Sequence, residues 1–139
     1  MLAEPEVLRQ YDVLMSANSI YFLTSRREYR KAIAAFHEVL NPGGVVAVMT
    51  PNRYHPEEAT TGLTGVQFLP DRIAEWYVQY RGARSTYADV RLPSSFELQW
   101  WFRRAGFEDA TVVDAYQFTD DNWQRHFKPR FYLTARKPE

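Results

Sequence analysis

The sequence predicts an α/β fold built on an open, partly parallel sheet. An amphipathic helix at 25–40 ends in a glycine turn, and the following run, 45–49, is apolar on both faces, as is typical of a central parallel strand. A shorter apolar run at 11–17 precedes the helix, so strand, helix, turn and strand make one βαβ unit. The 139 residues fit a single domain, 1–139.

Four strands are expected. YDVLMSA is short, apolar and followed by polar residues, which predicts a buried strand. VVAVM has no polar position, and DATVVDAYQF alternates between apolar and polar residues. The last two strands are consecutive, and we expect them to be antiparallel neighbours. The predicted strands cover 11–17, 45–49, 109–118 and 130–136.

Three helices are expected. In the first, apolar residues recur at three- and four-residue spacings from Tyr29 to Leu40, with Ser25 as the N-cap. The turn at 41–44, NPGG, ends this helix because proline cannot continue it and glycine accepts left-handed dihedral angles. The other two helices are predicted from Asp71 to Tyr80 and from a cap at Ser94 or Ser95 to Gly106.

Composition narrows the classes of partner and location. Seventeen basic and seventeen acidic residues cancel, which argues against nucleic acid or an anionic membrane as a partner. No apolar run approaches the roughly 20 residues that span a bilayer, and the first residues lack the layout of a signal peptide. The chain has no cysteine, so thiolate chemistry is excluded. We expect a soluble, cytoplasmic protein.

Several motifs occur in a recognisable order. They are YDVLMSAN, a helix ending in EVLNPGGVVAVMTPN, SSFELQWWFRRAGFEDATVV and the closing FYLTARKP. Together they resemble the C-terminal half of class I S-adenosylmethionine-dependent methyltransferases, whose fold is Rossmann-like. The loop TPNRYHP also resembles one subgroup of that family.

The resemblance implies a partial fold. The family's sheet order is 3-2-1-4-5-7-6, and the strands present here correspond to the block 4-5-7-6, with the last strand antiparallel. The family's glycine-rich cofactor turn has no counterpart, since none of the six glycines forms G-x-G-x-G. The strand at Asp12–Ser16 would then be an unpaired edge. We expect a partner to pair with it: the missing N-terminal half, a second copy or a partner subunit.

The resemblance also implies a function. The intact enzyme would transfer a methyl group from S-adenosylmethionine to a small-molecule acceptor, largely by aligning the two reactants. The alternative is a catalytically inactive methyltransferase-like subunit that binds and stabilises a partner protein.

By resemblance, Ser16, Ala17 and Asn18 are the cofactor-binding candidates, because in the family this strand end lies beside the transferable methyl group. Asn18 could instead be a turn residue that satisfies its own backbone. Tyr21 is a substrate-binding candidate.

The other candidates follow the second strand of the βαβ unit, where ligands bind in open α/β sheets. Asn52, Arg53 and Tyr54 are predicted to bind substrate, and Arg53 could hold an anionic group. His55 is the catalytic candidate, as a general base near its ordinary pKa. The alternative is a solvated loop in which Asn52 supports the turn.

Other polar and aromatic residues are assigned structural roles. No two of the three histidines have ligand spacing on a helix, so no metal site is expected. His126 is expected in a solvated connection, and Glu57 and Glu58 are expected to face water. Of the adjacent Trp100 and Trp101, one should be core and the other should line a pocket or interface.

Overall fold

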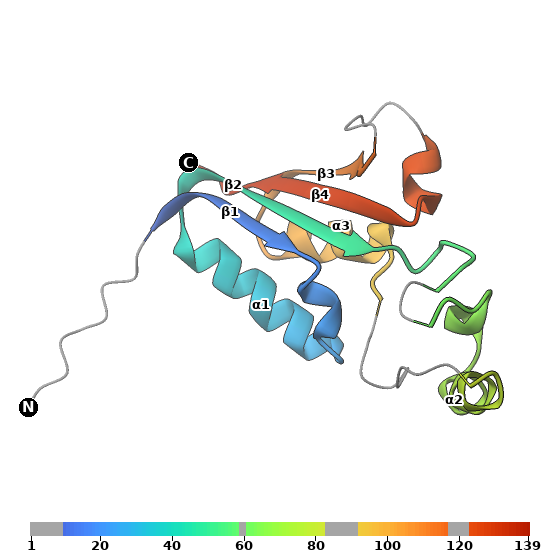
Figure 1. The fold of residues 1–139 in the computed structure, drawn as a ribbon. Coiled ribbons are helices and arrows are strands. Elements are labelled where there is room, and N and C mark those ends of the chain that lie inside the picture. The colour runs from blue at the N-terminus through green and yellow to red at the C-terminus, as the bar shows by residue number, and fades with distance from the viewer. Residues whose placement is uncertain (1–9, 59–60, 83–91, 117–122) are drawn as a thin grey trace, which may run out of the picture.

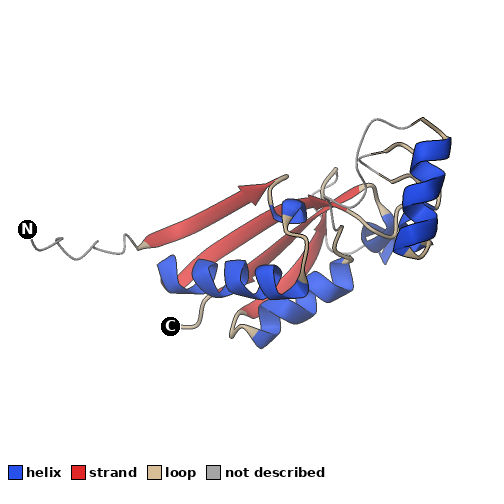
Figure 2. Cartoon of the chain, turned by 90° about the horizontal axis from the view of Figure 1, so that it is seen from below, coloured by secondary structure: helices blue, strands red, loops and turns tan. Residues whose placement is uncertain are grey.

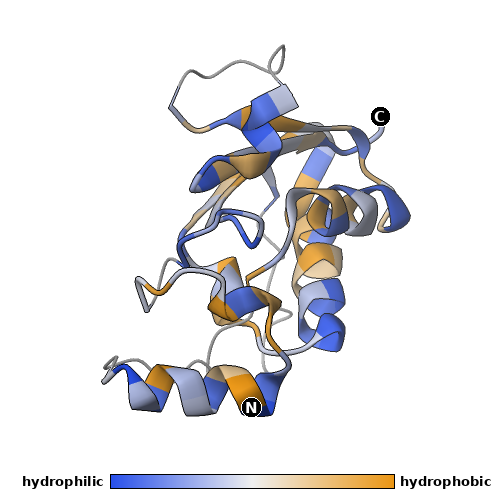
Figure 3. Ribbon diagram, turned by 90° about the vertical axis from the view of Figure 1, so that its right-hand side faces the viewer, coloured by the Kyte–Doolittle hydropathy of each residue, from blue (hydrophilic) through white to orange (hydrophobic). Residues whose placement is uncertain are grey.

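The computed structural model describes residues 10–58, 61–82, 92–116 and 123–139. Four strands form one sheet, and two helices, α1 and α3, pack on the same face of it (Figures 1 and 2). A third helix, α2, lies to one side with its own small cluster of apolar residues (Figure 3). The predicted α/β class is confirmed.

The strand order confirms the predicted block. The sheet runs β1-β2-β4-β3, in which β1 and β2 are parallel and β4 is antiparallel to both β2 and β3. This is the order that the resemblance implies for the block 4-5-7-6. The strands are β1 (Tyr11–Ala17), β2 (Leu40–Pro51), β3 (Glu108–Asp114) and β4 (Arg130–Arg136).

The helices begin at the predicted caps. The side chains of Ser25 and Ser94 each accept a hydrogen bond from the backbone N–H three residues on, and Glu28 and Glu97 complete two capping boxes. The helices are α1 (Arg26–Val39), α2 (Asp71–Tyr80) and α3 (Ser95–Arg104). Short 3₁₀ turns are η1 (Ile20–Phe22), η2 (Val66–Phe68) and η4 (Trp123–Phe127).

Two predicted boundaries are wrong. The segment 41–44 ends α1 as expected, but it belongs to β2, which starts at Leu40. Residues after β4 hold it there: Lys137 N–H donates to the Gly44 carbonyl at 2.8 Å, and Gly43 N–H donates to the Lys137 carbonyl at 3.0 Å. The third strand ends at Asp114 rather than at 118, and positions 117 and 118 lie outside the described residues.

Gly44 lies where β1 and β2 approach closely. A Cβ atom there would come within 2.8 Å of the Asn41 carbonyl oxygen and 3.2 Å of the Tyr11 carbonyl oxygen, both of which are backbone atoms. We expect Gly44→Ala to lower the free energy of unfolding by about 1–3 kcal/mol, measured by urea denaturation. At Gly43 a Cβ would meet only the Glu139 side chain, at 3.8 Å, so Gly43→Ala should cost only the strain of its positive φ. Equal stability of Gly44→Ala and the parent would contradict this account.

The core lies between the sheet and the two helices. Inward-facing residues of β2 and β4 meet α1 and α3 there, and all of them are fully or almost fully buried. Its fully buried side chains include Tyr29, Ile33, Leu98, Phe102, Phe131 and Leu133. A separate cluster around Val66, Ala74 and Val78 ties α2 to η2.

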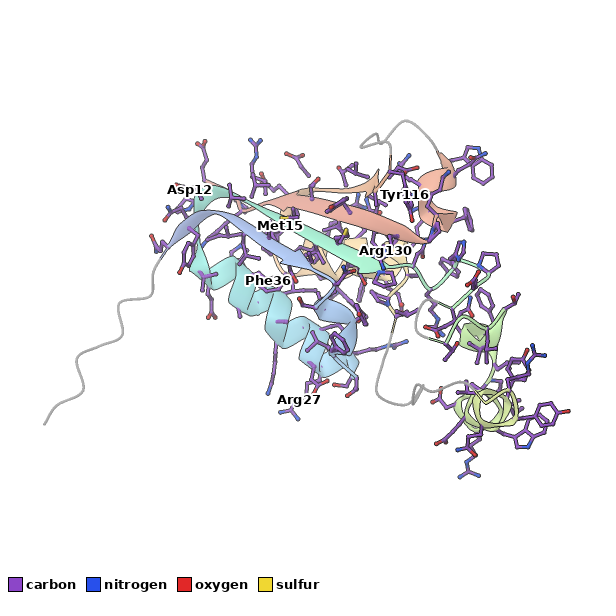
Figure 4. The ribbon with its side chains drawn as sticks, viewed as in Figure 1. Asp12, Met15, Arg27, Phe36, Tyr116 and Arg130 are labelled. Atoms are coloured by element: carbon purple, nitrogen blue, oxygen red, sulfur yellow. The ribbon has the colours of Figure 1, made fainter. Side chains whose placement is uncertain are left out.

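The opposite face of the sheet is uncovered by the described elements. On β1 the side chains of Val13 and Met15 are 68% and 64% exposed, and Met15 points away from α1 (Figure 4). The prediction of a buried first strand is therefore wrong. The cause is that α1 and α3 share one face, so no helix that the structure describes covers the alternate positions of each strand. This open face carries Val13, Met15, Val45, Ala47, Met49, Val113 and Tyr132.

Candidate functional site

The parallel strands β1 and β2 bring the predicted site residues to one edge of the sheet. Ala17 pairs with Met49, and the Asn18 N–H donates to the Met49 carbonyl oxygen at 2.9 Å. The segment after β1 and the segment after β2 therefore start side by side. Ligands of open α/β sheets bind at this edge, beyond the carboxyl ends of the strands.

Asn18 carries an unsatisfied polar atom at this edge. Its backbone has φ of +53°, a left-handed conformation that asparagine tolerates. Its side-chain Oδ1 is buried and accepts no hydrogen bond from any residue that the structure describes. Burying an acceptor without a donor costs free energy, so a ligand N–H or O–H that reaches this atom would be bound favourably.

The other candidates on β1 and η1 lie around Asn18. Ser16 is half-buried and Ala17 is exposed on the open face, because successive side chains of a strand point to opposite sides. Tyr21 is half-buried, and its ring lies 4.4 Å from that of Phe22.

Asn52 ties the end of β2 to the segment before β4. Its side-chain Nδ2 donates to the carbonyl oxygens of His126 at 2.6 Å and Lys128 at 2.9 Å, and its Oδ1 accepts from the Tyr54 N–H at 3.1 Å. Only 2% of the residue is exposed. Asn52 therefore fixes the position of the loop that carries the remaining candidates.

His55 has one ring nitrogen available for proton transfer. Its Nδ1 lies 3.0 Å from the Glu57 carbonyl oxygen. A carbonyl oxygen only accepts, so in the neutral imidazole the proton is on Nδ1 and the lone pair is on Nε2. The backbone of His55 is held by Asn52, whose carbonyl accepts its N–H, and by Gln67, whose side chain donates to its carbonyl. The imidazole is half-buried on an anchored turn, where it can act as a base.

An aromatic cluster stands beside this loop. The Tyr54 ring lies 6.2 Å from the rings of Phe96 and Phe127, and Phe96 stacks on the His126 imidazole at 4.4 Å. Tyr54, Phe96 and Phe127 are 38–50% exposed. Three elements, the loop after β2, the start of α3 and η4, thus present ring surface at the same edge. Arg53 is half-buried next to the cluster, and its N–H donates to the Pro93 carbonyl.

The connection that carries His126 is exposed or half-buried, as expected, but the half-buried His126 side chain also makes contacts within the fold. Its Nδ1 lies 2.8 Å from the hydroxyl of Ser95, which is fully buried, and its backbone carbonyl accepts from Asn52. Sequence reasoning missed the pairing of Ser95 with His126. They are separated by 31 positions, and no local pattern links them.

Burial, together with the positive charge of Arg125, lowers the pKa of His126 below its usual value of 6.5. The unfolded chain therefore takes up this proton at a higher pH than the folded chain, and stability falls as the pH drops below about 6.5. We expect the urea concentration at the midpoint of unfolding to decrease when the pH is lowered from 7.5 to 5.5. This decrease should be smaller in the His126→Asn variant. An unchanged pH dependence in His126→Asn would contradict the assignment.

Glu58 departs from its prediction. It is 1% exposed, and its Oε2 accepts from the N–H and the hydroxyl of Thr61 at 2.7 Å, so it fixes a turn instead of facing water. Glu57 is exposed as expected.

The prediction for the tryptophans is confirmed: Trp101 is 5% exposed in the core, and Trp100, 55% exposed, lines a pocket.

Within the described ranges no group of three or more His, Asp or Glu side chains is placed to hold a metal ion. Among the helices described, none has the length and apolar character needed to cross a bilayer.

The sequence matches a family model whose description is methyltransferase domain, over residues 8–112. The chain belongs to this family. The comparison with curated proteins finds no match for this methyltransferase domain.

Solved structures resemble the methyltransferase domain in fold. A S-adenosylmethionine-dependent methyltransferase from Clostridium acetobutylicum ATCC 824 superposes with a TM-score of 0.65 at 12% identity, covering 98% of this chain and 62% of that one. The N-methyltransferase NodS from Bradyrhizobium japonicum WM9, in complex with S-adenosyl-L-homocysteine, superposes with a TM-score of 0.51 at 13% identity. The match covers 94% of this chain and 48% of that one. Human N-acetylserotonin methyltransferase in complex with S-adenosylmethionine superposes with a TM-score of 0.54 at 12% identity. The match covers 92% of this chain and 30% of that one.

These matches confirm the class I methyltransferase fold. The methyltransferase domain spans 30–62% of the length of the three solved chains. That it corresponds to the C-terminal half stays a prediction.

Proposed function

We propose that this chain is the substrate-facing part of a S-adenosylmethionine-dependent methyltransferase that acts on a small-molecule acceptor. The observation that carries the proposal is the buried Oδ1 of Asn18 at the edge of the sheet, which has no hydrogen-bond partner among the described residues. Membership of the methyltransferase-domain family and the fold of the solved relatives support the same chemistry.

In this proposal the end of β1 forms one wall of a cofactor site. Asn18 Oδ1 could accept a hydrogen bond from the cofactor, and Ser16 and Ala17 would line the same strand end. When bound, S-adenosylmethionine supplies a reactive methyl sulfonium. The glycine turn that would form the opposite wall is absent from this sequence.

The chain's own residues would then align the acceptor. Their part would be to hold the acceptor in line with the methyl group that a bound S-adenosylmethionine would supply. The acceptor's proton goes to His55 Nε2, whose lone pair is set by the contact of Nδ1 with Glu57. Tyr21 and Tyr54 offer ring surface to the acceptor, and Arg53 offers a charge for an anionic group. Asn52 holds the loop in place.

A partner on β1 belongs to this proposal. The strand is at the sheet edge, and two of its apolar side chains, Val13 and Met15, are largely exposed. An N-terminal half of the fold, a second copy or another subunit would pair with the strand and cover the open face. Hydrogen exchange tests this: amides 12–16 should be protected in the assembly. A monodisperse monomer with rapid exchange at these amides would argue against a partner.

The second candidate function is a catalytically inactive subunit that stabilises a partner through β1 and the open face. The same exposed residues favour it.

Calorimetric titration of S-adenosyl-L-homocysteine separates the two functions. Micromolar binding, a free energy of about −8 kcal/mol, would support the enzyme, and Asn18→Leu should weaken that binding. Tyr116→Leu, an exposed change near the far edge of the sheet, is the control. No detectable heat would favour the subunit.

A further inference from the structure

A hollow lies between the helices α1 and α3, and neither the cofactor nor the acceptor proposal uses it. It has a volume of about 420 Å³, and its floor includes the buried side chains of Ile33 and Trp101. Three arginines line it, Arg26 and Arg30 from α1 and Arg104 from α3, together with Trp100. We call it the arginine–tryptophan groove. A volume of this size is typical of small-molecule sites.

The groove carries an excess of positive charge. Among the described residues lining it and the adjoining hollow, the only acid is Glu97, which lies 4.0 Å from Arg26. No ion pair is found for Arg30 or Arg104 in the part of the chain that the structure describes. Two guanidinium charges on facing helices thus stay available, although the protein as a whole has zero net charge.

The groove also offers an aromatic surface. Trp100 is 55% exposed, and the Arg104 guanidinium lies 5.1 Å from its ring centre. Indole faces and guanidinium planes both stack on aromatic rings. An adjoining hollow of about 370 Å³, also lined by Trp100, extends past Phe96, so more than a single ring could be accommodated.

From this combination we infer that the arginine–tryptophan groove binds a small aromatic phosphomonoester. Such a group carries a charge of about −1.5 to −2 at neutral pH, which matches the two available guanidinium groups. Arginine binds phosphate oxygens in bidentate fashion, and the tryptophan would stack on the ring. The inference is independent of methyl transfer, since the groove contains none of the residues assigned to the cofactor or to proton transfer.

The probe is 1-naphthyl phosphate, titrated into the whole chain by calorimetry in the presence of saturating S-adenosyl-L-homocysteine. The ring alone, 1-naphthol, and inorganic phosphate are titrated in parallel. We expect 1-naphthyl phosphate to bind at least about tenfold more tightly than either part, because charge-assisted hydrogen bonds and stacking act together. Inorganic phosphate binding equally well would overturn the inference, because the ring would then contribute nothing.

Variants locate the binding. Arg30→Gln combined with Arg104→Gln keeps side-chain length, removes both charges and should weaken binding at least about tenfold. The matched control is Arg72→Gln combined with Arg81→Gln, two exposed arginines of α2 and its C-cap, which should bind like the parent. Equal weakening by both pairs would point to bulk charge and overturn the inference.

Trp100→Leu supplies an independent test. The residue is exposed, so the change leaves the core packed. The variant should bind 1-naphthyl phosphate more weakly than the parent and bind inorganic phosphate with the same affinity. Unaltered binding of 1-naphthyl phosphate in this variant would show that the ring is held elsewhere.

Discussion

Asn52→Asp should destabilise the folded chain by about 3–5 kcal/mol at pH 7. The substitution keeps the shape of the side chain but replaces the donating Nδ2 with an oxygen. That oxygen would face the carbonyl oxygens of His126 and Lys128 at the positions now 2.6 and 2.9 Å away. With 2% exposure, water cannot compensate for the two lost hydrogen bonds or for the charge.

The pH dependence identifies the cause. Burial and the facing carbonyl oxygens raise the pKa of the new carboxyl above its unfolded value of about 3.9. At a pH between the folded and unfolded pKa values, the unfolded chain then holds fewer protons than the folded chain. The loss in free energy of unfolding relative to the parent should therefore shrink as the pH falls from 7 toward 4. Gln79→Glu on the exposed face of α2 adds the same charge and should change stability by less than about 0.5 kcal/mol. Urea denaturation at both pH values measures the effect, and a deficit that is constant with pH would contradict this explanation.

Phe102→Ala should cost about 3–5 kcal/mol. The side chain is fully buried at the centre of the core, with its ring 5.1 Å from that of Phe107. Removing it leaves a cavity that the surrounding helix and strands can fill only in part. Domains of this size are stable by about 5–15 kcal/mol, so the variant would be partly unfolded at moderate urea concentrations.

Phe68→Ala is the matched control because it removes the same ring from a 55% exposed position. The free energy of unfolding of both variants should be obtained from urea denaturation. Comparable losses in the two variants would mean that the core assigned here does not dominate stability.

The sequence was sufficient for most of the fold because its local signals agree. Both capping boxes, the apolar spacing of α1 and the run of β2 each identify an element without knowledge of its neighbours. The strand order came from the family resemblance. The sequence could not show that α1 and α3 pack on the same face. Val13 and Met15 therefore look like core residues, although no described element covers the face on which they lie.

The candidate site was predictable only in part. The edge of the sheet follows from the βαβ unit, and with it the neighbourhood of Asn18 and His55. The contacts of Asn52 with His126 and Lys128 join positions 74 and 76 residues apart, and the contact of Ser95 with His126 depends on the path of the chain between them. Tertiary contacts of this kind leave no periodic trace in a sequence.

The position of β4 has a consequence for the order in which the sheet assembles during synthesis. Among the described strands, β3 pairs with β4 alone, and β4 is the last of the four to leave the ribosome. At about 5–20 residues per second, β1 and β2 can pair while β3 waits for its partner. The antiparallel part of the sheet should therefore form in a single late step. In pulse-labelled refolding, the amides of β3 and β4 should become protected together.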